Sequence, residues 1–185
     1  PNSTNPILNE MLDSLAWAAV GGNFSAGEAL GAVTGTAAAV ISDSGKINLA
    51  YRESSVPFSY EVGAGKPVGL AVEISMAVAD EVKKTLGKNV EVGWQSVTSA
   101  NRIPLLVNGT IDLECGSTTN NLDRQKQVGF TNTYFLTANR YVAKKSSNIK
   151  KLADLKGKTV VSTAGTTNIK WLTEENGKQN LGMNI

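Results

Sequence analysis

The stretch TSANRIPLLVNGTIDLECGSTTNNLDR, residues 98–124, decides the fold of this chain. Its segment 111–115 alternates apolar and polar residues, which predicts a strand that ends in a polar loop. Arg102 precedes this strand, and Arg124 follows the loop. Because a guanidinium presents a planar fork of donors that matches a carboxylate, the stretch suits a small ligand that carries carboxylate groups.

The composition is that of a globular protein. The chain has 185 residues, of which 41% are hydrophobic and 18% are charged, and its formal net charge is +2. Such a small charge, without a block of lysine or arginine, argues against nucleic acid as the partner. The chain has no histidine and one cysteine, Cys115, which excludes histidine triads and Cys-cluster zinc sites, so we expect no metal and no cofactor. We expect Cys115 to be a small buried hydrophobe.

Residues 1–41 differ in composition from the rest and form a leader in our domain scheme. Residues 7–20 have a helical period, and residues 21–40 are rich in Gly, Ala and Thr. Three interpretations are open: a remnant of a secretory signal, a membrane span, or an amphipathic helix with a small-residue segment packed on the body. We favour the third interpretation, because residues 21–40 are too polar for a span and no basic region precedes them.

From residue 42 onward, strands and helices alternate. A turn at residues 42–45 and a loop over residues 53–60 flank the first strand, and a Gly-rich turn covers residues 62–67. The expected strands are 46–52, 89–97, 111–115, 134–143 and 158–162. The expected helices are 68–86, which ends at Gly87, 99–106 with Ser99 as N-cap, 121–127, 149–155 and 168–176. This order predicts an α/β domain with parallel strands.

Ligands of such sheets bind at the carboxyl ends of the strands. Arg52 closes the first strand, Ser99 and Arg102 follow the second, and the hydroxyl and amide residues 117–121 follow the third. Three strand ends therefore bring arginines and hydroxyls to one edge of the sheet. This convergence is the reason to expect a binding site there.

Four runs also resemble a known family. They are YRESSVPFSY (51–60), VGLAVEIS (68–75), residues 98–135, and LADLKGKTVVSTAGTT (152–167). They resemble the periplasmic solute-binding proteins of polar amino-acid ABC transporters, and most closely the glutamate/aspartate-binding branch. The resemblance covers about residues 44–185 and does not include residues 1–40.

The resemblance implies a two-lobe α/β fold that closes on its ligand around a hinge. Lobe one would be nearly complete and cover residues 42–139. The hinge would cross near residues 137–142, and residues 140–185 would hold this hinge and a partial lobe two. The return crossing that completes both lobes would lie beyond Ile185, so a partner chain, a separate fragment or a domain-swapped copy would complete the lobes.

The resemblance also implies roles for three arginines. Arg52 would bind the side-chain carboxylate of glutamate or aspartate. Arg102, with Ser99 beside it at the end of the second strand, would help to neutralise the same distal carboxylate. Arg124 would bind the α-carboxylate of the ligand.

Three hydroxyl residues complete the implied site. Ser117 and Thr119 would bind the main-chain groups of the ligand, and Thr167 would offer its hydroxyl at the start of a lobe-two helix, where free N–H groups attract anions. Two family features are missing: the histidine of lobe two has no counterpart, and the acidic residue that pairs with the ligand ammonium would lie beyond Ile185.

The function expected from these residues is the capture of an acidic L-amino acid in the periplasm and its delivery to the membrane subunits of an ABC transporter, without catalysis. One alternative is an enzyme on the same fold, such as a carboxylate dehydratase, which needs a general acid or base. Glu53, Asp112 and Glu114 are the candidates for that role. A second alternative is a ligand-sensing or assembly fragment in which the leader mediates association.

Overall fold

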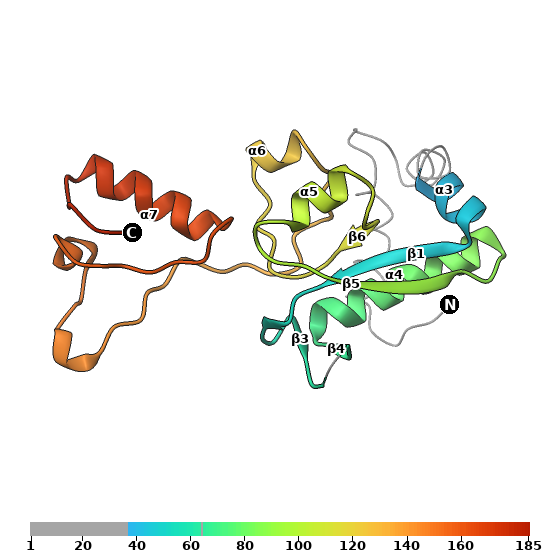
Figure 1. The fold of residues 1–185 in the computed structure, drawn as a ribbon, viewed down its shortest axis with the longest axis horizontal. Coiled ribbons are helices and arrows are strands. Elements are labelled where there is room, and N and C mark those ends of the chain that lie inside the picture. Colours follow the sequence, from blue (N-terminus) through green and yellow to red (C-terminus); the bar gives the residue numbers. More distant parts are fainter. Residues whose placement is uncertain (1–36, 64) are drawn as a thin grey trace. The chain divides into compact units, whose positions relative to one another are not determined.

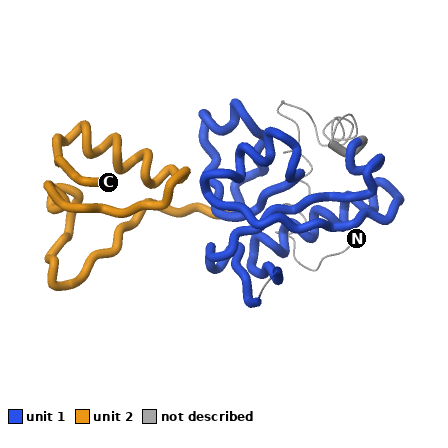
Figure 2. The backbone as a smooth tube through the Cα atoms, in the orientation of Figure 1, with its two compact units in different colours: residues 1–134 blue, residues 135–185 orange. Residues whose placement is uncertain are grey.

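A computed structural model of the protein describes residues 37–63 and 65–185. The helix expected over residues 7–20 and most of the leader lie outside the described residues. The chain divides into two compact units between Tyr134 and Phe135, whereas the sequence placed the division after residue 139 (Figure 2). Each unit is described by itself below.

A parallel sheet forms the centre of the N-terminal unit. Strand β1 (Lys46–Tyr51) lies between β5 (Glu91–Ser96) and β6 (Leu113–Glu114), and both neighbours run parallel to it (Figure 1). This arrangement confirms the predicted α/β fold with parallel pairing. Strand β6 is shorter than the predicted 111–115, because its ladder with β1 spans only two residue pairs.

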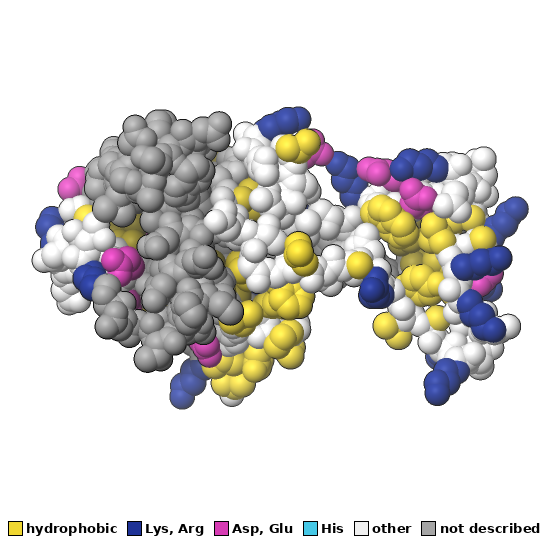
Figure 3. Space-filling view, turned by 180° about the vertical axis from the view of Figure 1, so that it is seen from behind, with side chains coloured by type: hydrophobic (Ala, Val, Ile, Leu, Met, Phe, Trp, Pro, Cys, Tyr) yellow, Lys and Arg dark blue, Asp and Glu magenta, His cyan; other side chains and the backbone are white. Residues whose placement is uncertain are grey.

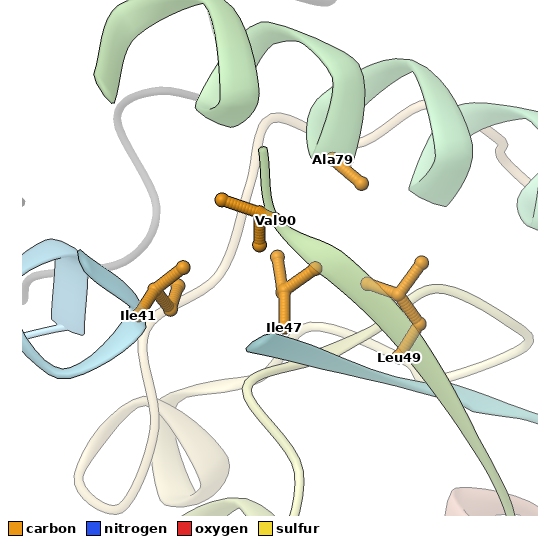
Figure 4. Packing of buried hydrophobic residues seen from close by; sticks show 5 residues of the cluster. All are labelled: Ile41, Ile47, Leu49, Ala79 and Val90. Carbon is orange, nitrogen blue, oxygen red and sulfur yellow. The ribbon is translucent and has the colours of Figure 1, made fainter. Parts of the chain in front are cut away.

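Helix α4 (Leu70–Leu86) packs on this sheet through its apolar side. Ile47 and Leu49 of β1 point towards Ala79 of the helix (Figure 4). Leu49 has no solvent exposure, and it belongs to the same core cluster as Ala79 of α4. The helix ends at Gly87, as the sequence predicts, in a left-handed conformation with a φ of 59°. Burial of this interior holds the strand ends in fixed positions.

The start of α4 is capped by a loop. The N–H groups of Leu70 and Ala71 donate to the carbonyl oxygens of Pro57 and Phe58, at 3.2 and 2.8 Å. Gly69 permits this approach, because a Cβ atom there would lie 2.5 Å from the Phe58 carbonyl oxygen. The loop expected over residues 53–60 is therefore partly structured. It holds β2 (Ser54–Ser55) and the start of β3 (Ser59–Glu61), which form a small antiparallel sheet with β4 (Pro67–Val68).

Two local predictions were wrong at helix ends. Residues 42–44 belong to α3 (Ala37–Ser44), and only Gly45 turns the chain into β1. Helix α5 (Arg102–Val107) has Asn101 as its N-cap, where the sequence favoured Ser99. The side chain of Asn101 makes no cap bond to the helix and instead accepts a hydrogen bond from the N–H of Thr98, at 2.7 Å. The short α6 (Leu122–Gln125) lies within the predicted helix 121–127.

The C-terminal unit is built from helical turns. It holds two 3₁₀ turns, η1 (Lys145–Ser147) and η2 (Leu152–Leu155), and the helix α7 (Thr167–Lys178). The strands expected over residues 134–143 and 158–162 are absent from this part of the described chain, where one isolated bridge joins Thr159 to Asn184. A strand needs a hydrogen-bonded neighbour, and apolar periodicity alone does not supply one.

A small core stabilises this unit. Its buried members come from η2, α7 and the segment after α7, and they are Leu155, Leu172, Leu181 and Met183. Other apolar side chains of the unit lie at its surface (Figure 3). Leu136 is 87% exposed and Val142 is fully exposed. None of the helices in the described part of the chain has the length and apolar character to cross a membrane.

Candidate ligand-binding site

The three parallel strands end at one edge of the sheet. Tyr51 ends β1 opposite Ser96 at the end of β5, and β6 ends at Glu114 beside β1. The residues that follow these ends are the predicted site residues of the N-terminal unit. Parallel pairing therefore gathers segments that lie up to about seventy positions apart in the sequence.

Arg52 joins the end of β1 to the loop after β6. Its backbone N–H donates to Ser59 Oγ at 2.8 Å, and its Nη1 atom donates to Ser117 Oγ at 3.5 Å. Among the described residues, neither Glu53 nor Asp112 forms an ion pair with it. Glu53 accepts from Ser96 Oγ at 2.6 Å, and Asp112 accepts from the backbone N–H of Asn48 at 2.7 Å. The side chain of Arg52 thus points towards the polar loop.

Arg102 and Glu114 form a buried pair of opposite charges. Both side chains are 2% exposed, and Arg102 Nη1 lies 3.9 Å from Glu114 Oε1. The second carboxylate oxygen, Oε2, accepts a hydrogen bond from Thr118 Oγ1 at 2.5 Å. Within the described structure, Arg102 Nε, Arg102 Nη1 and Glu114 Oε1 have no hydrogen-bond partner. Charge attraction, rather than a direct hydrogen bond, therefore links the two groups.

The loop after β6 is held at both ends. Asn121 caps α6, because its Oδ1 atom accepts the N–H of Arg124 at 2.9 Å. Arg124 Nη1 donates to the carbonyl oxygen of Thr119 at 2.8 Å. The loop and the arginine that follows it are thus one connected structure. The side chains of Ser117 and Thr119 remain exposed.

The pKa shifts of the arginines show that these groups share one electrostatic environment. Burial lowers the pKa of Arg102, the Glu114 carboxylate opposes this shift, and the positive charges of Arg124 and Arg52 add to it. Burial also lowers the pKa of Arg124, and Glu114 again opposes the shift. Three guanidinium groups and one carboxylate therefore act on one another at the strand ends. Such a cluster favours an anion over a neutral molecule.

Tyr134, the last residue of the N-terminal unit, is hydrogen-bonded to the loop after β6. Its hydroxyl accepts the N–H of Gly116 at 3.1 Å and donates to the Gly116 carbonyl oxygen at 2.5 Å. Burial raises the pKa of Tyr134, so the phenol stays protonated and keeps this donor. Burial likewise raises the pKa of Cys115 to about 12, as expected for a buried thiol. The position of the loop thus depends on a residue outside the stretch 98–124.

Comparison with known proteins shows which family has this arrangement of strands and helices. Residues 47–180 match the model of the bacterial extracellular solute-binding proteins, family 3. The chain belongs to this family. The matched residues include the sheet, α4, the arginine cluster and α7, so the family-3 fold covers both described units.

Two curated relatives of this family-3 chain bind acidic amino acids. This chain is 48% identical over 147 residues to the L-glutamate/L-aspartate-binding protein of Pseudomonas aeruginosa. The aligned residues cover 78% of this chain and 49% of that protein. This chain is 50% identical over 146 residues to the glutamate/aspartate import solute-binding protein of Salmonella typhimurium. The aligned residues cover 78% of this chain and 48% of that protein. The chain thus spans about half the length of these relatives.

A solved structure supports the fold. An ancestral amino-acid-binding protein, described as a precursor of cyclohexadienyl dehydratase, has a TM-score of 0.60 and 25% identity to this chain. The match covers 81% of this chain and 62% of that one. These relatives are binding proteins, in line with the predicted periplasmic-binding-protein-like α/β fold.

The structure groups some of the predicted site residues. Arg52, Arg102, Ser117, Thr119 and Arg124 lie around the loop after β6 through the contacts above. Ser99 lies between β5 and α5 and is 7% exposed. Thr167 begins α7 in the C-terminal unit, where Thr166 caps the helix. Their contacts with a ligand stay predictions.

Sequence reasoning named Glu114 only as a candidate general acid or base and Thr118 only as one of the polar residues 117–121. It missed Gly116 and Tyr134 altogether. Glu114 had a detectable signal, because it is the charge between two apolar residues of a predicted strand. Tyr134 carried no such signal, since its contact with Gly116 spans eighteen positions. Among the described residues, no group of three or more carboxylates and thiols is placed to hold a metal ion.

Proposed function

We propose that this chain binds an acidic L-amino acid, glutamate or aspartate, for uptake by an ABC transporter. The observation that carries the proposal is the gathering of Arg52, Arg102 and Arg124 around the polar loop at the ends of parallel strands. Its identity of 48–50% to glutamate/aspartate-binding relatives supports the same ligand class.

The charge of the site suits a ligand with two carboxylates. An unpaired buried ion costs several kcal/mol, so a dicarboxylate needs positive charge beside both of its ends. Arg52, next to Ser117, would bind the side-chain carboxylate, and Arg124, next to Thr119, would bind the α-carboxylate. Ser117 and Thr119 would bind the ligand's main-chain groups, and a ligand contact of the Thr167 hydroxyl stays a prediction from the sequence.

Delivery follows from this binding role. Family-3 proteins are extracellular solute-binding proteins, and we propose the periplasm as the compartment of this chain, after removal of a signal. Its partners would be the membrane subunits of an ABC importer. The chain spans about half the length of its curated relatives.

Calorimetric titration of the chain with glutamate, aspartate and glutamine tests the proposal. We expect glutamate or aspartate to bind at least about tenfold more tightly than glutamine, since a hydrogen bond to a charged group is worth about 1.5–3 kcal/mol. Glutamine that binds as tightly as glutamate would argue against the arginine cluster as the site.

The substitution Arg124→Met sharpens this test. We expect it to weaken glutamate binding by roughly 30-fold, because it removes one charged hydrogen-bond donor. Lys126→Met is the matched control, since Lys126 lies two positions further on and pairs only at the surface with Asp123, at 3.5 Å. Equal losses in both variants would show that general charge, and not the site, attracts the ligand.

A further inference from the structure

Glu114 is a buried acidic group beside Arg102, and the function proposed above does not use it. Its side chain is 2% exposed and faces Arg102 at 3.9 Å. It opposes the pKa shifts of both Arg102 and Arg124. A carboxylate in this place works against anion binding, because it repels the ligand's own carboxylates.

The surroundings of Glu114 hold its carboxylate in place. Thr118 Oγ1 donates to Oε2 at 2.5 Å. A Cβ atom on Gly116 would lie 2.5 Å from Oε1 and 3.5 Å from Arg52 Cγ, so the glycine leaves the space that the carboxylate fills. The φ of Gly116 does not lie in the left-handed region, which leaves this space as the reason for a glycine there.

The polar atoms that lack a hydrogen bond indicate the role of the Arg102–Glu114 pair. A buried charge without a partner is strongly destabilising, and both Arg102 and Glu114 are buried charges. Each is the nearest opposite charge to the other, yet Arg102 Nε and Nη1 and Glu114 Oε1 make no hydrogen bond in the described structure. Arg102 thus has a buried counter-ion that it contacts by charge and not by a hydrogen bond.

We infer that Glu114 is the internal counter-ion of Arg102 and sets the net charge of the arginine cluster. Three guanidinium groups and one carboxylate leave a charge of +2, which matches the two carboxylates of an acidic amino acid. Glu114 is therefore a positioning and specificity-determining residue. Its effect on specificity rests on the proposed function, whereas its link to Arg102 does not.

The first experiment measures the link without any ligand. Denaturant unfolding midpoints are compared for the chain, for Arg102→Met, for Glu114→Gln and for the double variant. Each single substitution leaves one buried charge uncompensated, so we expect both to lower the midpoint. The double variant should lower the midpoint by less than the sum of the two single shifts. Additive shifts would overturn the inference.

The second experiment measures the ratio of the dissociation constants of glutamine and glutamate. Glu114→Gln removes a negative charge near the ligand's side-chain carboxylate, which only glutamate carries. At a separation of about 10 Å and an effective dielectric constant of about 20, we expect this ratio to rise about tenfold. A residue that only supported the fold would weaken both ligands alike, and an unchanged or lower ratio would overturn the role in specificity.

Glu81→Gln is the matched control for both experiments. Glu81 lies on α4, is half-exposed and pairs with Lys84 at 3.0 Å on the surface. The unfolding midpoint of this variant and its ratio of dissociation constants for glutamine and glutamate should therefore stay close to those of the unchanged chain. If the unchanged chain bound neither amino acid, the proposed function would fail. The inferred link would then be decided by the unfolding midpoints alone.

Discussion

The two units of this chain bury their apolar residues to different degrees. In the N-terminal unit, Leu49 of β1 and Ile74 of α4 are 0% and 1% exposed. In the C-terminal unit, Leu155 and Leu172 are 6% and 8% exposed. The difference shows that a helix packed on a parallel sheet buries its apolar side chains more completely than the helical turns of the C-terminal unit do.

The arginine cluster belongs to the unit with the deeper core. Fixed strand ends hold Arg52 and Glu114 in place, and burial strengthens the electrostatic interactions between such groups. The C-terminal unit offers Thr167 at the start of α7, which is anchored by local hydrogen bonds. The contrast predicts that substitutions have larger and more cooperative effects in the N-terminal unit.

The largest expected effect comes from the core of the sheet. Leu49→Ala should lower the free energy of unfolding of the N-terminal unit by about 3 kcal/mol, because it leaves a cavity without access to solvent. Leu172→Ala in the C-terminal unit should cost about 2 kcal/mol, since its small core is freer to collapse. Amide hydrogen exchange, followed separately for residues 37–134 and 135–185, measures both. An equal or larger loss for Leu172→Ala would remove the contrast.

A smaller effect is expected at the cap of α7. Thr166 Oγ1 accepts the N–H of Ile169 at 3.3 Å, so Thr166→Ala should lower the stability of the C-terminal unit by about 1 kcal/mol. Thr173→Ala is the control within the same helix, because its hydroxyl bonds the carbonyl oxygen of Ile169 and caps no helix end. Circular dichroism during thermal unfolding measures both variants. Similar shifts for the two would show that Thr166 does not act as a cap.

The smallest effect depends on pH. The backbone N–H groups of Lys150 and Lys151 donate to Asp154 and lower its pKa. A carboxylate with a lowered pKa adds stability above its unfolded pKa, and this stability is lost as the pH falls through the folded pKa. Asp154→Asn should therefore slightly destabilise the C-terminal unit at neutral pH and have no effect in strong acid. Hydrogen exchange at both pH values tests this, and a difference that persists in acid would contradict it.

Local sequence patterns predicted the elements that carry their own signals. The alternation in residues 46–52 gave β1, and the helical period of 68–86 ended at Gly87 as expected, because a glycine reaches the left-handed conformation without strain. Parallel order followed from the alternation of strands and helices. Predictions failed where a partner decides the structure: residues 134–143 are apolar and periodic but form no ladder in the described chain.

The candidate site likewise has features that the local sequence predicts and features that depend on packing partners. The arginines and hydroxyls could be named from the sequence, because parallel strands end at one edge and the residues after them meet there. The buried position of Arg102 could not, since it depends on how α5 and β6 pack. The same holds for the Tyr134 hydroxyl on Gly116, a contact between residues eighteen positions apart.

The sequence by itself determined which chemistry this chain carries: guanidinium groups and hydroxyls that follow strands, with no histidine. The tertiary structure decided which of these charges compensate one another. Glu114 neutralises part of the charge of Arg102 because burial brings the two side chains to 3.9 Å and removes the water that would otherwise screen them. Burial and pairing depend on the whole fold, and a local pattern of residues does not contain them.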